Sequence, residues 1–307
     1  ELDDLILIRS DGHPTYNFAV VIDDLDMNIT HVIRGDDHIN NTPRQINIFR
    51  ALNALEPVFA HLPMILGEDG KRLSKRHGAV SVLQFRELGV LPHALLNYLV
   101  RLGWSHGDQE LFSVAEMISY FDLAHVSRGV SSFNYEKLYW INQHYQKSDD
   151  PVQVAAALRW HFEQAGVDLS SGPDLSEVVA LQAERCKTLV EMCTLSTYFY
   201  TEEVEYNDDA IKKHLRPVIL EPLTALHQKL SALPAWEKEQ LQECINDVCV
   251  QFDLNMGKIA QPLRVAVTGN GMSPSIDATL MLIGKRRSLM RLQNALELIK
   301  NRAAANS

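Results

Sequence analysis

Strand signals are concentrated near the start of this 307-residue chain, and their position limits the folds open to it. Apolar, β-favouring runs in residues 30–38 and 62–66 flank a helical pattern that begins at Thr42-Pro43. Strand, helix, strand is the building unit of a doubly wound parallel sheet. Between residues 152 and 307 strand signals are nearly absent, and prolines divide a helical pattern. The sequence therefore predicts part of an α/β sheet followed by a helical region.

Polar side chains follow the first of these strands. We expect residues 30–38 to begin as a buried parallel strand and to release Arg34, Asp36, Asp37 and His38 at its carboxyl end. Ligands of open α/β sheets bind outside the carboxyl ends of the strands, so a nucleotide site is predicted here. Arg34 can hold a carboxylate through two N–H groups. A structural ion pair with Asp36 or Asp37 is the alternative.

Three local expectations complete this part. Residues 5–9 predict a short strand that ends in a turn at residues 10–14. Residues 15–25 fit both strand and helix, and the helix is favoured because Thr15 can cap it. The helix that begins at Thr42 is expected to bury one apolar stripe, made of Ile46, Phe49, Leu52 and Leu55.

A cationic segment follows at residues 71–76, in a chain whose formal net charge is -10. Glycines at 67 and 70 predict a turn before it, which places the cations on a loop. Such a loop suits a polyphosphate. Lys75 would supply a compact charge, Arg76 a planar fork and Ser74 a hydroxyl that shapes the loop. A solvated basic turn is the alternative.

The order Arg72-Leu73-Ser74-Lys75-Arg76 resembles the second signature of class I aminoacyl-tRNA synthetases, the KMSKS loop, in its glutamyl-tRNA synthetase form. Arg72 stands where lysine is frequent in that family, which leaves the role of this position open. Further stretches that resemble the family are residues 9–17, 32–38, 41–45, 137–142 and 256–269. The likeness thus runs along nearly the whole chain.

The resemblance implies ATP-dependent activation of L-glutamate to glutamyl-adenylate and transfer of glutamate to the 3′ end of tRNA(Glu). By position it implies glutamate contacts from Tyr16 and Arg34, a core tyrosine being the alternative for Tyr16. It implies ATP contacts from Asp37, His38 and Lys75. The implied catalytic residues are Lys75, Arg72, Ser74 and Arg76. ATP with Mg²⁺ enters as a substrate, and we expect no zinc site in this chain.

The family likeness also implies contacts to tRNA. Lys137 lies in a Lys-Leu-x-Trp-x-Asn element, within which Leu138 and Trp140 are expected in the core. Lys285, Arg286 and Arg287 form a second local basic concentration. The implied architecture is the C-terminal half of a Rossmann-like catalytic domain at 1–64, the KMSKS loop with a helical stem-contact domain at 65–147, and an all-α anticodon-binding domain at 148–307. We expect the last to have two subdomains that meet near residue 210, and a linker at 147–151.

Two absences lead to further expectations. The chain has no His-x-Gly-His element, the first signature of this class, so we expect it to be the C-terminal portion of a longer protein and unable to form glutamyl-adenylate by itself. It has no apolar run near the roughly 20 residues of a membrane span, so we expect a cytoplasmic protein without membrane contact. Separately, we expect a monomer. Its four cysteines are expected as reduced core residues, with Cys186 and Cys193 on one helix face, and residues 303–307 as a frayed tail.

Competing interpretations come from related enzymes and from a different class. The enzyme that glutamylates a modified tRNA base lacks an anticodon-binding half, which residues 152–307 would supply here. Glutaminyl-tRNA synthetase is expected to be β-rich in its C-terminal region. The alternative from another class is a fragment or paralogue that binds tRNA without catalysing a reaction.

Overall fold

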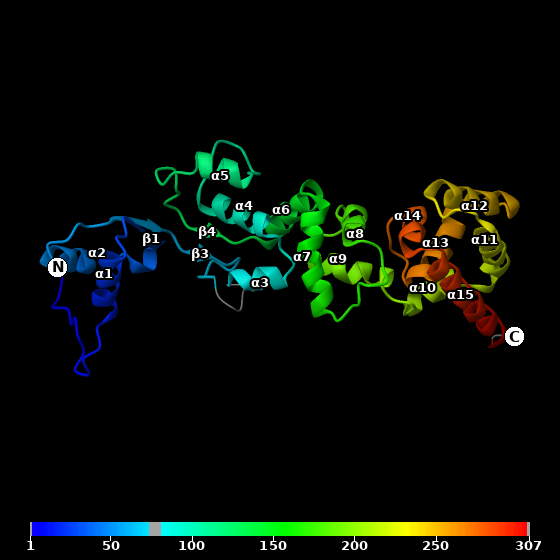
Figure 1. Cartoon of the computed structure of the whole chain (residues 1–307), viewed down its shortest axis with the longest axis horizontal. Helices are drawn as coiled ribbons and strands as arrows, with labels where there is room; N and C mark the ends of the chain where they lie inside the picture. Colours follow the sequence, from blue (N-terminus) through cyan, green and yellow to red (C-terminus); the bar gives the residue numbers. More distant parts are fainter. Residues whose placement is uncertain (1, 74–80, 306–307) are drawn as a thin grey trace. The chain divides into compact units, whose positions relative to one another are not determined.

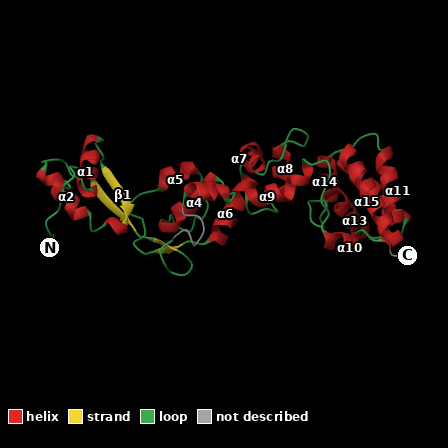
Figure 2. Ribbon diagram, turned by 90° about the horizontal axis from the view of Figure 1, so that it is seen from below, coloured by secondary structure: helices red, strands yellow, loops and turns green. Residues whose placement is uncertain are grey.

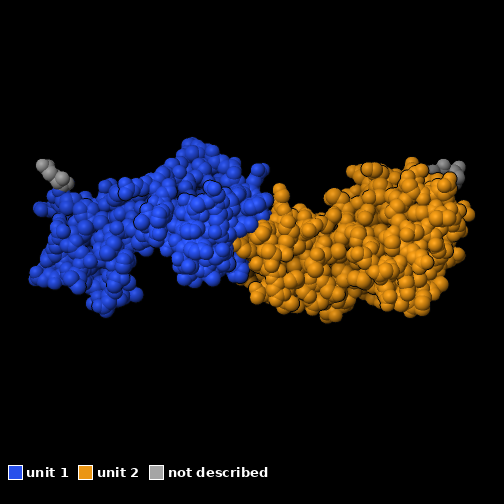
Figure 3. All heavy atoms as spheres, turned by 90° about the horizontal axis from the view of Figure 1, so that it is seen from above, with its two compact units in different colours: residues 1–84, 92–141 blue, residues 85–91, 142–307 orange. Residues whose placement is uncertain are grey.

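The structure is a computed structural model that describes residues 2–73 and 81–305. The chain divides into two compact units, coloured separately in Figure 3. Unit 1 comprises Glu1–Gln84 and Pro92–Ile141, and unit 2 comprises Phe85–Leu91 and Asn142–Ser307.

Unit 1 begins with a parallel strand–helix–strand arrangement, as the sequence predicts. Its elements are α1 (Tyr16–Asp26), β1 (His31–Gly35), the short 3-10 helix η1 (Asp36–His38), α2 (Thr42–Ala51) and β2 (Val58–Leu62). The two strands lie side by side in Figure 2. They run parallel, with Arg34 opposite His61. Helices α1 and α2 pack around a small core of Val21, Ile48 and Phe49. The helix favoured for residues 15–25 is confirmed, but the Thr15 side chain does not cap it, because its hydroxyl donates to the Ile6 carbonyl at 2.8 Å instead.

The strand boundaries differ from the sequence expectation. Residues 5–9 form no strand, only a single bridge between Ile8 and Pro14. The second strand was expected at 62–66, but the strand that pairs with β1 is β2 at Val58–Leu62. Ile65–Leu66 forms a separate strand, β3, that pairs with β4 (Ser131–Ser132). Pro63 lies between β2 and β3 and has no N–H to donate to a ladder, which explains the interruption.

The apolar stripe predicted for α2 is also wrong in part. The buried side chains of this helix include Gln45, Ile48 and Phe49, whereas Leu52 is exposed and Leu55 is 93% exposed. The helix ends because Asn53 adopts a left-handed conformation with φ of 52° just after its last turn. Strand β1 is not buried either, since a sheet of two strands leaves its residues only half covered.

A tight turn precedes the cationic segment, as predicted. The Gly67 N–H donates to the Lys71 carbonyl at 2.7 Å, and the Leu73 N–H donates to the Ile65 carbonyl at 2.9 Å. These bonds close a hairpin directly before residue 74. Residues 74–80 lie outside the described part of the chain.

Short helices follow in the region expected to be helical. Their bounds are α3 (Val82–Glu87), α4 (Pro92–Gly103), α5 (Val114–Tyr120) and α6 (Tyr135–Ser148). On α6, Leu138 is fully buried as expected, but Trp140 is 47% exposed. Residues two apart do not share a helix face, so the burial of Leu138 turns Trp140 outward.

Every regular element of unit 2 among its described residues from 152 onward is a helix, as predicted, and loops join these helices (Figure 1). Its helices are α7 (Pro151–Gln164), α8 (Leu175–Gln182), α9 (Leu189–Ser196), α10 (Asp208–His214), α11 (Leu220–Ala232), α12 (Lys238–Gln251), α13 (Met256–Thr268), α14 (Ile276–Ile283) and α15 (Lys285–Ala305), with 3-10 turns η3 (Thr197–Phe199) and η4 (Pro217–Ile219). The expected linker is wrong, because only residues 149 and 150 separate α6 from α7, and Asp150 caps α7. Helix α15 continues through Ala305, where a frayed tail was expected.

Asn142 holds the segment 85–91 within unit 2. Its side-chain oxygen accepts from the Leu91 N–H at 2.7 Å, and its amide nitrogen donates to the carbonyls of Gly89 and Lys187 at 3.1 and 2.7 Å. Gly89 has a φ of 78°, and a Cβ there would meet the Val190 nitrogen at 2.5 Å. Asn142, a member of the family-like element, therefore has a structural role.

The cysteines are free thiols, as expected; three of them are buried, but Cys249 is only half-buried, which corrects the expectation that all four lie in the core. Burial raises the pKa of Cys186 to about 12 and that of Cys193 to about 11, so both stay protonated at neutral pH. Cys186 precedes α9 and does not share a helix with Cys193, which corrects the expectation of one face. Within residues 2–73 and 81–305 no cluster of metal-ligating side chains is found, and no helix has both the length and the apolar character to span a bilayer.

His161 makes the stability of unit 2 depend on pH. It is buried on α7 beside Trp160, and burial together with the positive charge of Arg86 lowers its pKa below the ordinary 6.5. Below pH 6.5 this histidine binds a proton in the unfolded chain but stays neutral in the folded chain until the pH reaches its lowered pKa. The free energy of unfolding therefore falls as the pH falls. We expect His161→Leu to reduce the loss of urea resistance between about pH 7.5 and about pH 5. Parallel pH profiles for the wild type and the variant would contradict this.

Candidate functional site

Arg34 is the centre of the candidate site in unit 1. It lies near the carboxyl end of β1, half-buried, and one terminal nitrogen, Nη2, donates to both Thr42 Oγ1 and Gln45 Oε1 at 2.8 Å. Its guanidinium lies 5.4 Å from the centre of the Phe59 ring. The ion pair with Asp36 or Asp37 considered as the alternative is not formed. Both acceptors on α2 are neutral groups.

Tyr16 and His38 lie beside each other near the carboxyl end of β1. The Tyr16 hydroxyl is 3.4 Å from His38 Nδ1, and the two ring centres are 5.8 Å apart. The amide nitrogen of Asn41 lies 3.2 Å from the same Nδ1, so this nitrogen accepts a hydrogen bond. Tyr16 is 51% exposed, which excludes the core tyrosine considered as the alternative. Its hydroxyl is open to a ligand.

Asp37 connects the strand end to the cationic segment. Arg72 Nη2 donates to Asp37 Oδ2 at 3.3 Å, in a pair in which both side chains are substantially exposed. Asp37 also folds back over Gly35, where a Cβ would lie 2.6 Å from its Oδ1. Glycine at position 35 therefore permits the bend that brings Asp37 toward Arg72. An exposed pair of this kind is weak and can open for a ligand.

The positive charge of Arg34 affects two further titratable groups. His61 lies opposite Arg34 on β2, and burial together with Arg34 lowers its pKa, which keeps the ring neutral at physiological pH. The pKa of Asp24 is raised by burial, while Arg34 acts in the opposite direction. Neither group forms a hydrogen bond to Arg34 in the described part of the chain.

The structure therefore gathers five predicted site residues around the carboxyl end of β1: Tyr16, Arg34, Asp37, His38 and Arg72. The remaining residues of the predicted loop site, Ser74, Lys75 and Arg76, lie outside the described residues.

Lys137 is held by its own neighbours in unit 1. Its ammonium pairs with Glu110 at 2.7 Å and lies 4.3 Å from the centre of the exposed Trp140 ring. Glu110 also pairs with Arg101 at 3.4 Å, and the hydrogen bond from Lys137 is the main cause of its lowered pKa. A phosphate would have to compete with a carboxylate for Lys137.

The three basic residues predicted at the start of α15 differ in their burial and in their hydrogen-bond partners. Lys285 donates to the Leu233 carbonyl at 2.7 Å, and Arg286 forms an exposed ion pair with Glu202 at 2.6 Å. Arg287 is buried and donates to the carbonyls of Phe199, Thr201 and Ser171. This arrangement gives Arg287 a structural role, and tRNA contact by Lys285 and Arg286 stays a prediction.

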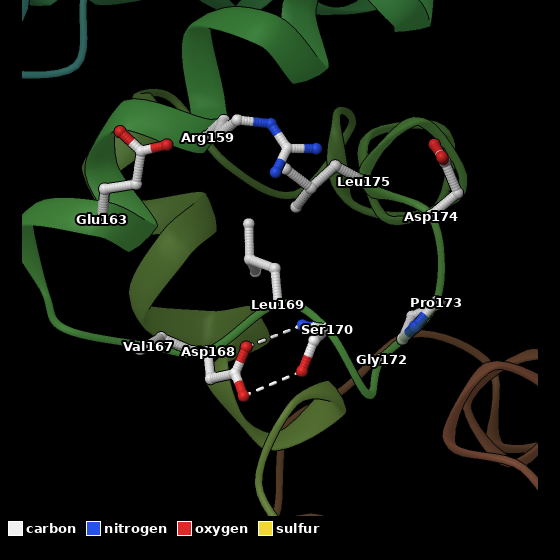
Figure 4. A pocket seen from close by; sticks show the side chains of 10 residues that line it. All are labelled: Arg159, Glu163, Val167, Asp168, Leu169, Ser170, Gly172, Pro173, Asp174 and Leu175. Atoms are coloured by element: carbon white, nitrogen blue, oxygen red, sulfur yellow. Dashed lines mark hydrogen bonds between the residues drawn. The ribbon is translucent and has the colours of Figure 1, made fainter.

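A cavity of about 560 Å³ lies in unit 2, between α7 and the loop that follows it (Figure 4). Its lining consists of Arg159, Glu163, Val167, Asp168, Leu169, Ser170, Gly172, Pro173, Asp174 and Leu175. Hydrogen bonds from Ser170 and Ser176 lower the pKa values of Asp168 and Asp174, so both stay charged. Three carboxylates against one guanidinium disfavour a phosphate ligand, and we do not assign the catalytic site here.

The sequence did not reveal the partners of Arg34. Thr42, Gln45 and His61 were not expected at the site, nor was Asn17, whose Oδ1 accepts from Gln45 Nε2 at 3.0 Å. One signal was available: Thr42 and Gln45 are three residues apart at the start of a helix, and this spacing places both on one face.

Two family profiles match the chain in succession. Residues 1–140 match the family described as tRNA synthetases class I (E and Q), catalytic domain, and residues 153–296 match the anticodon binding domain. These matches cover both units.

Similar proteins point the same way. A glutamate–tRNA ligase of Legionella pneumophila (strain Corby) is 77% identical over 99% of this chain and 65% of its own length. A Coxiella burnetii (strain RSA 493 / Nine Mile phase I) protein called glutamate–tRNA ligase 1 is 58% identical over 97% of the chain and 64% of its own length. The chain thus spans less than two thirds of these relatives.

A solved structure agrees as well. The crystal structure of a glutamate tRNA ligase from Elizabethkingia meningosepticum, in complex with its amino acid, superposes with a TM-score of 0.79 at 30% identity. It covers 97% of this chain, which in turn covers 63% of that protein. The α/β part, the sequential family matches and these likenesses together show that the chain belongs to the class I tRNA synthetases for glutamate and glutamine, as a portion that carries a catalytic-domain region followed by an anticodon-binding domain.

Proposed function

We propose that this chain is part of a glutamate–tRNA ligase, which activates L-glutamate with ATP and transfers it to the 3′ end of tRNA(Glu). One observation carries the proposal: the half-buried guanidinium of Arg34 lies at a strand end, donates to neutral acceptors and has no carboxylate partner among the described residues, while the exposed Tyr16 contacts His38 just after the same strand. A side-chain carboxylate of about the size of that of glutamate suits this pair of groups. The names of the Legionella and Coxiella relatives support the same substrate.

The proposed mechanism relies on positioning and electrostatics. Arg34 and Tyr16 hold the amino acid, while Asp37 and His38 lie near the nucleotide. Lys75, supported by Arg72, Ser74 and Arg76, stabilises the charge that develops on the α-phosphate as pyrophosphate leaves. ATP enters with Mg²⁺ as a substrate, and no protein nucleophile is required.

Of the residues proposed to contact the α-phosphate, Arg72 lies within the described part of the chain. In the structure it pairs with Asp37 at 3.3 Å. We propose that arriving phosphates displace this exposed ion pair, so that Arg72 exchanges one carboxylate partner for stronger phosphate contacts.

The domain organisation follows from the same proposal. Residues 1–64 would form the C-terminal half of the catalytic domain, residues 65–147 the KMSKS loop and stem-contact domain, and residues 148–307 the anticodon-binding domain with two subdomains meeting near 210. Lys137, Lys285 and Arg286 are proposed tRNA contacts, and the protein is proposed to work in the cytoplasm as a monomer.

The deciding experiment is tRNA charging by the complete gene product that contains these residues, with labelled glutamate and separately with glutamine. We expect glutamate to be attached, and we expect Lys75→Ala to lower the rate of glutamyl-adenylate formation by roughly 100-fold, because one preorganised charge is lost. Glu68→Ala, outside the cationic segment, serves as the control substitution. Binding of tRNA without any charging would favour the alternative, a non-catalytic tRNA-binding fragment or paralogue.

A further inference from the structure

The guanidinium of Arg34 is held by one of its nitrogens only. Nη2 uses both of its hydrogens, one on Thr42 Oγ1 and one on Gln45 Oε1. The side chain has five N–H donors in all, so the Nε hydrogen and the two hydrogens of Nη1 remain. Nε is buried and has no partner within the described residues. A buried donor without a partner is costly, which points to a ligand at this end of the guanidinium.

Gln45 is itself fixed in orientation. It is 2% exposed, and because a guanidinium only donates, its amide must present Oε1 to Arg34. Its Nε2 then donates to Asn17 Oδ1 at 3.0 Å, next to Tyr16 on α1. Gln45 therefore links the strand that carries Arg34 to the helix that carries Tyr16.

Thr42 completes the support through a second neutral contact. Its hydroxyl accepts from Arg34 and lies 2.9 Å from His61 Nε2, and it is 3.4 Å from the His38 carbonyl. His61 is neutral because burial and Arg34 lower its pKa. Asp24 interacts electrostatically with Arg34, and Asp36 interacts electrostatically with His61. Neither carboxylate makes a hydrogen bond to the Arg34 guanidinium within the described residues. Within the described residues no carboxylate thus contacts the guanidinium of Arg34 to offset its positive charge.

We propose that Gln45 is a specificity-determining positioning residue: with Thr42 it forms a charge-neutral clamp that aims Arg34 and leaves its positive charge for the substrate carboxylate. The inference rests on the proposed function. A carboxylate clamp would position the arginine equally well but would neutralise it, and a neutralised guanidinium gains little from glutamate over glutamine. The clamp therefore contributes to the choice between acid and amide.

The test uses two substitutions of similar size in the complete gene product. Gln45→Glu replaces the amide nitrogen with an oxygen and adds a charge, and Asn17 can turn its amide to donate to the new oxygen. Gln45→Met keeps the volume and adds no charge. Steady-state ATP–pyrophosphate exchange gives kcat and KM for glutamate, glutamine and ATP.

We expect Gln45→Glu to raise the KM for glutamate and to lower the ratio of kcat/KM for glutamate over glutamine at least about tenfold, with the KM for ATP unchanged. Gln45→Met should raise the KM for glutamate less and keep most of the preference in kcat/KM for glutamate over glutamine, because methionine adds no carboxylate to offset the charge of Arg34. An unchanged ratio in Gln45→Glu, or equal losses for ATP and glutamate in both variants, would overturn the proposal.

A third variant covers the case in which Gln45→Glu does not fold. Thr42→Val removes the other acceptor and preserves the shape of the side chain. The proposal then predicts a higher KM for glutamate with kcat and the KM for ATP preserved, and wild-type values throughout would refute it. The outcome for the proposed function is separate, because that depends on whether the wild-type protein charges tRNA with glutamate at all.

Discussion

Arg34→Ala is expected to lower kcat/KM for glutamate in adenylate formation by about 1,000-fold in the complete gene product. The substitution removes the cation proposed to bind the substrate carboxylate, and it leaves Gln45, a buried acceptor, without its donor. Arg34→Lys should recover only a small part of the loss. An ammonium has no planar fork with which to contact Thr42, Gln45 and the ligand together. Glutamate-dependent ATP–pyrophosphate exchange measures the effect.

Arg50→Ala is the matched control for this prediction. Arg50 lies in the last turn of α2 and pairs with Glu56 at 2.7 Å, in an exposed position. Its removal is expected to leave the kinetics within twofold, since exposed ion pairs contribute little. A similar loss of activity in both variants, or an effect confined to the KM for ATP, would contradict the prediction that Arg34 binds the amino acid.

Arg291→Met is expected to lower the free energy of unfolding of unit 2 by about 3–5 kcal/mol. Arg291 is 1% exposed and donates to the carbonyls of Tyr198, Thr201, Glu202 and Val267. Burial, with Arg287 nearby, lowers its pKa to about 10, so it remains charged at neutral pH. Methionine fills much of the volume but satisfies none of these oxygens, and urea denaturation followed by circular dichroism measures the loss.

The control for Arg291 is on the same helix. Arg286 contacts the carboxylate of Glu202, whereas Arg291 contacts its backbone carbonyl, and the Arg286 side chain is exposed. Arg286→Met is therefore expected to cost less than about 1 kcal/mol. Equal destabilisation by both substitutions would show that burial of the guanidinium is not what matters.

Local signals in the sequence predicted the order of the elements well. The strand–helix–strand order after residue 30 and the helical unit 2 follow from periodicity and proline positions, which are properties of neighbouring residues. The boundaries were less accurate because they depend on single backbone groups. Pro63 ends one strand pairing, and the left-handed Asn53 ends α2 before Leu55.

The site was predictable in its members but not in its connections. The strand end and the family likeness selected Tyr16, Arg34 and Asp37, yet the sequence could not tell an aspartate partner for Arg34 from neutral acceptors on α2. That choice depends on how β1 packs against α2. In the same way, Arg287 belongs to a basic run in the sequence, and only the packing of α15 shows that its charge is buried.

The buried arginines of α15 also bear on the order in which the protein is synthesised. The carbonyl of Tyr198 leaves the ribosome 93 residues before the guanidinium of Arg291 that will bind it. At bacterial to eukaryotic elongation rates this delay lasts roughly 5 to 20 seconds. Throughout that interval the segment around residues 198–202 lacks its donors, so the nascent chain depends on α15 to complete this part of unit 2.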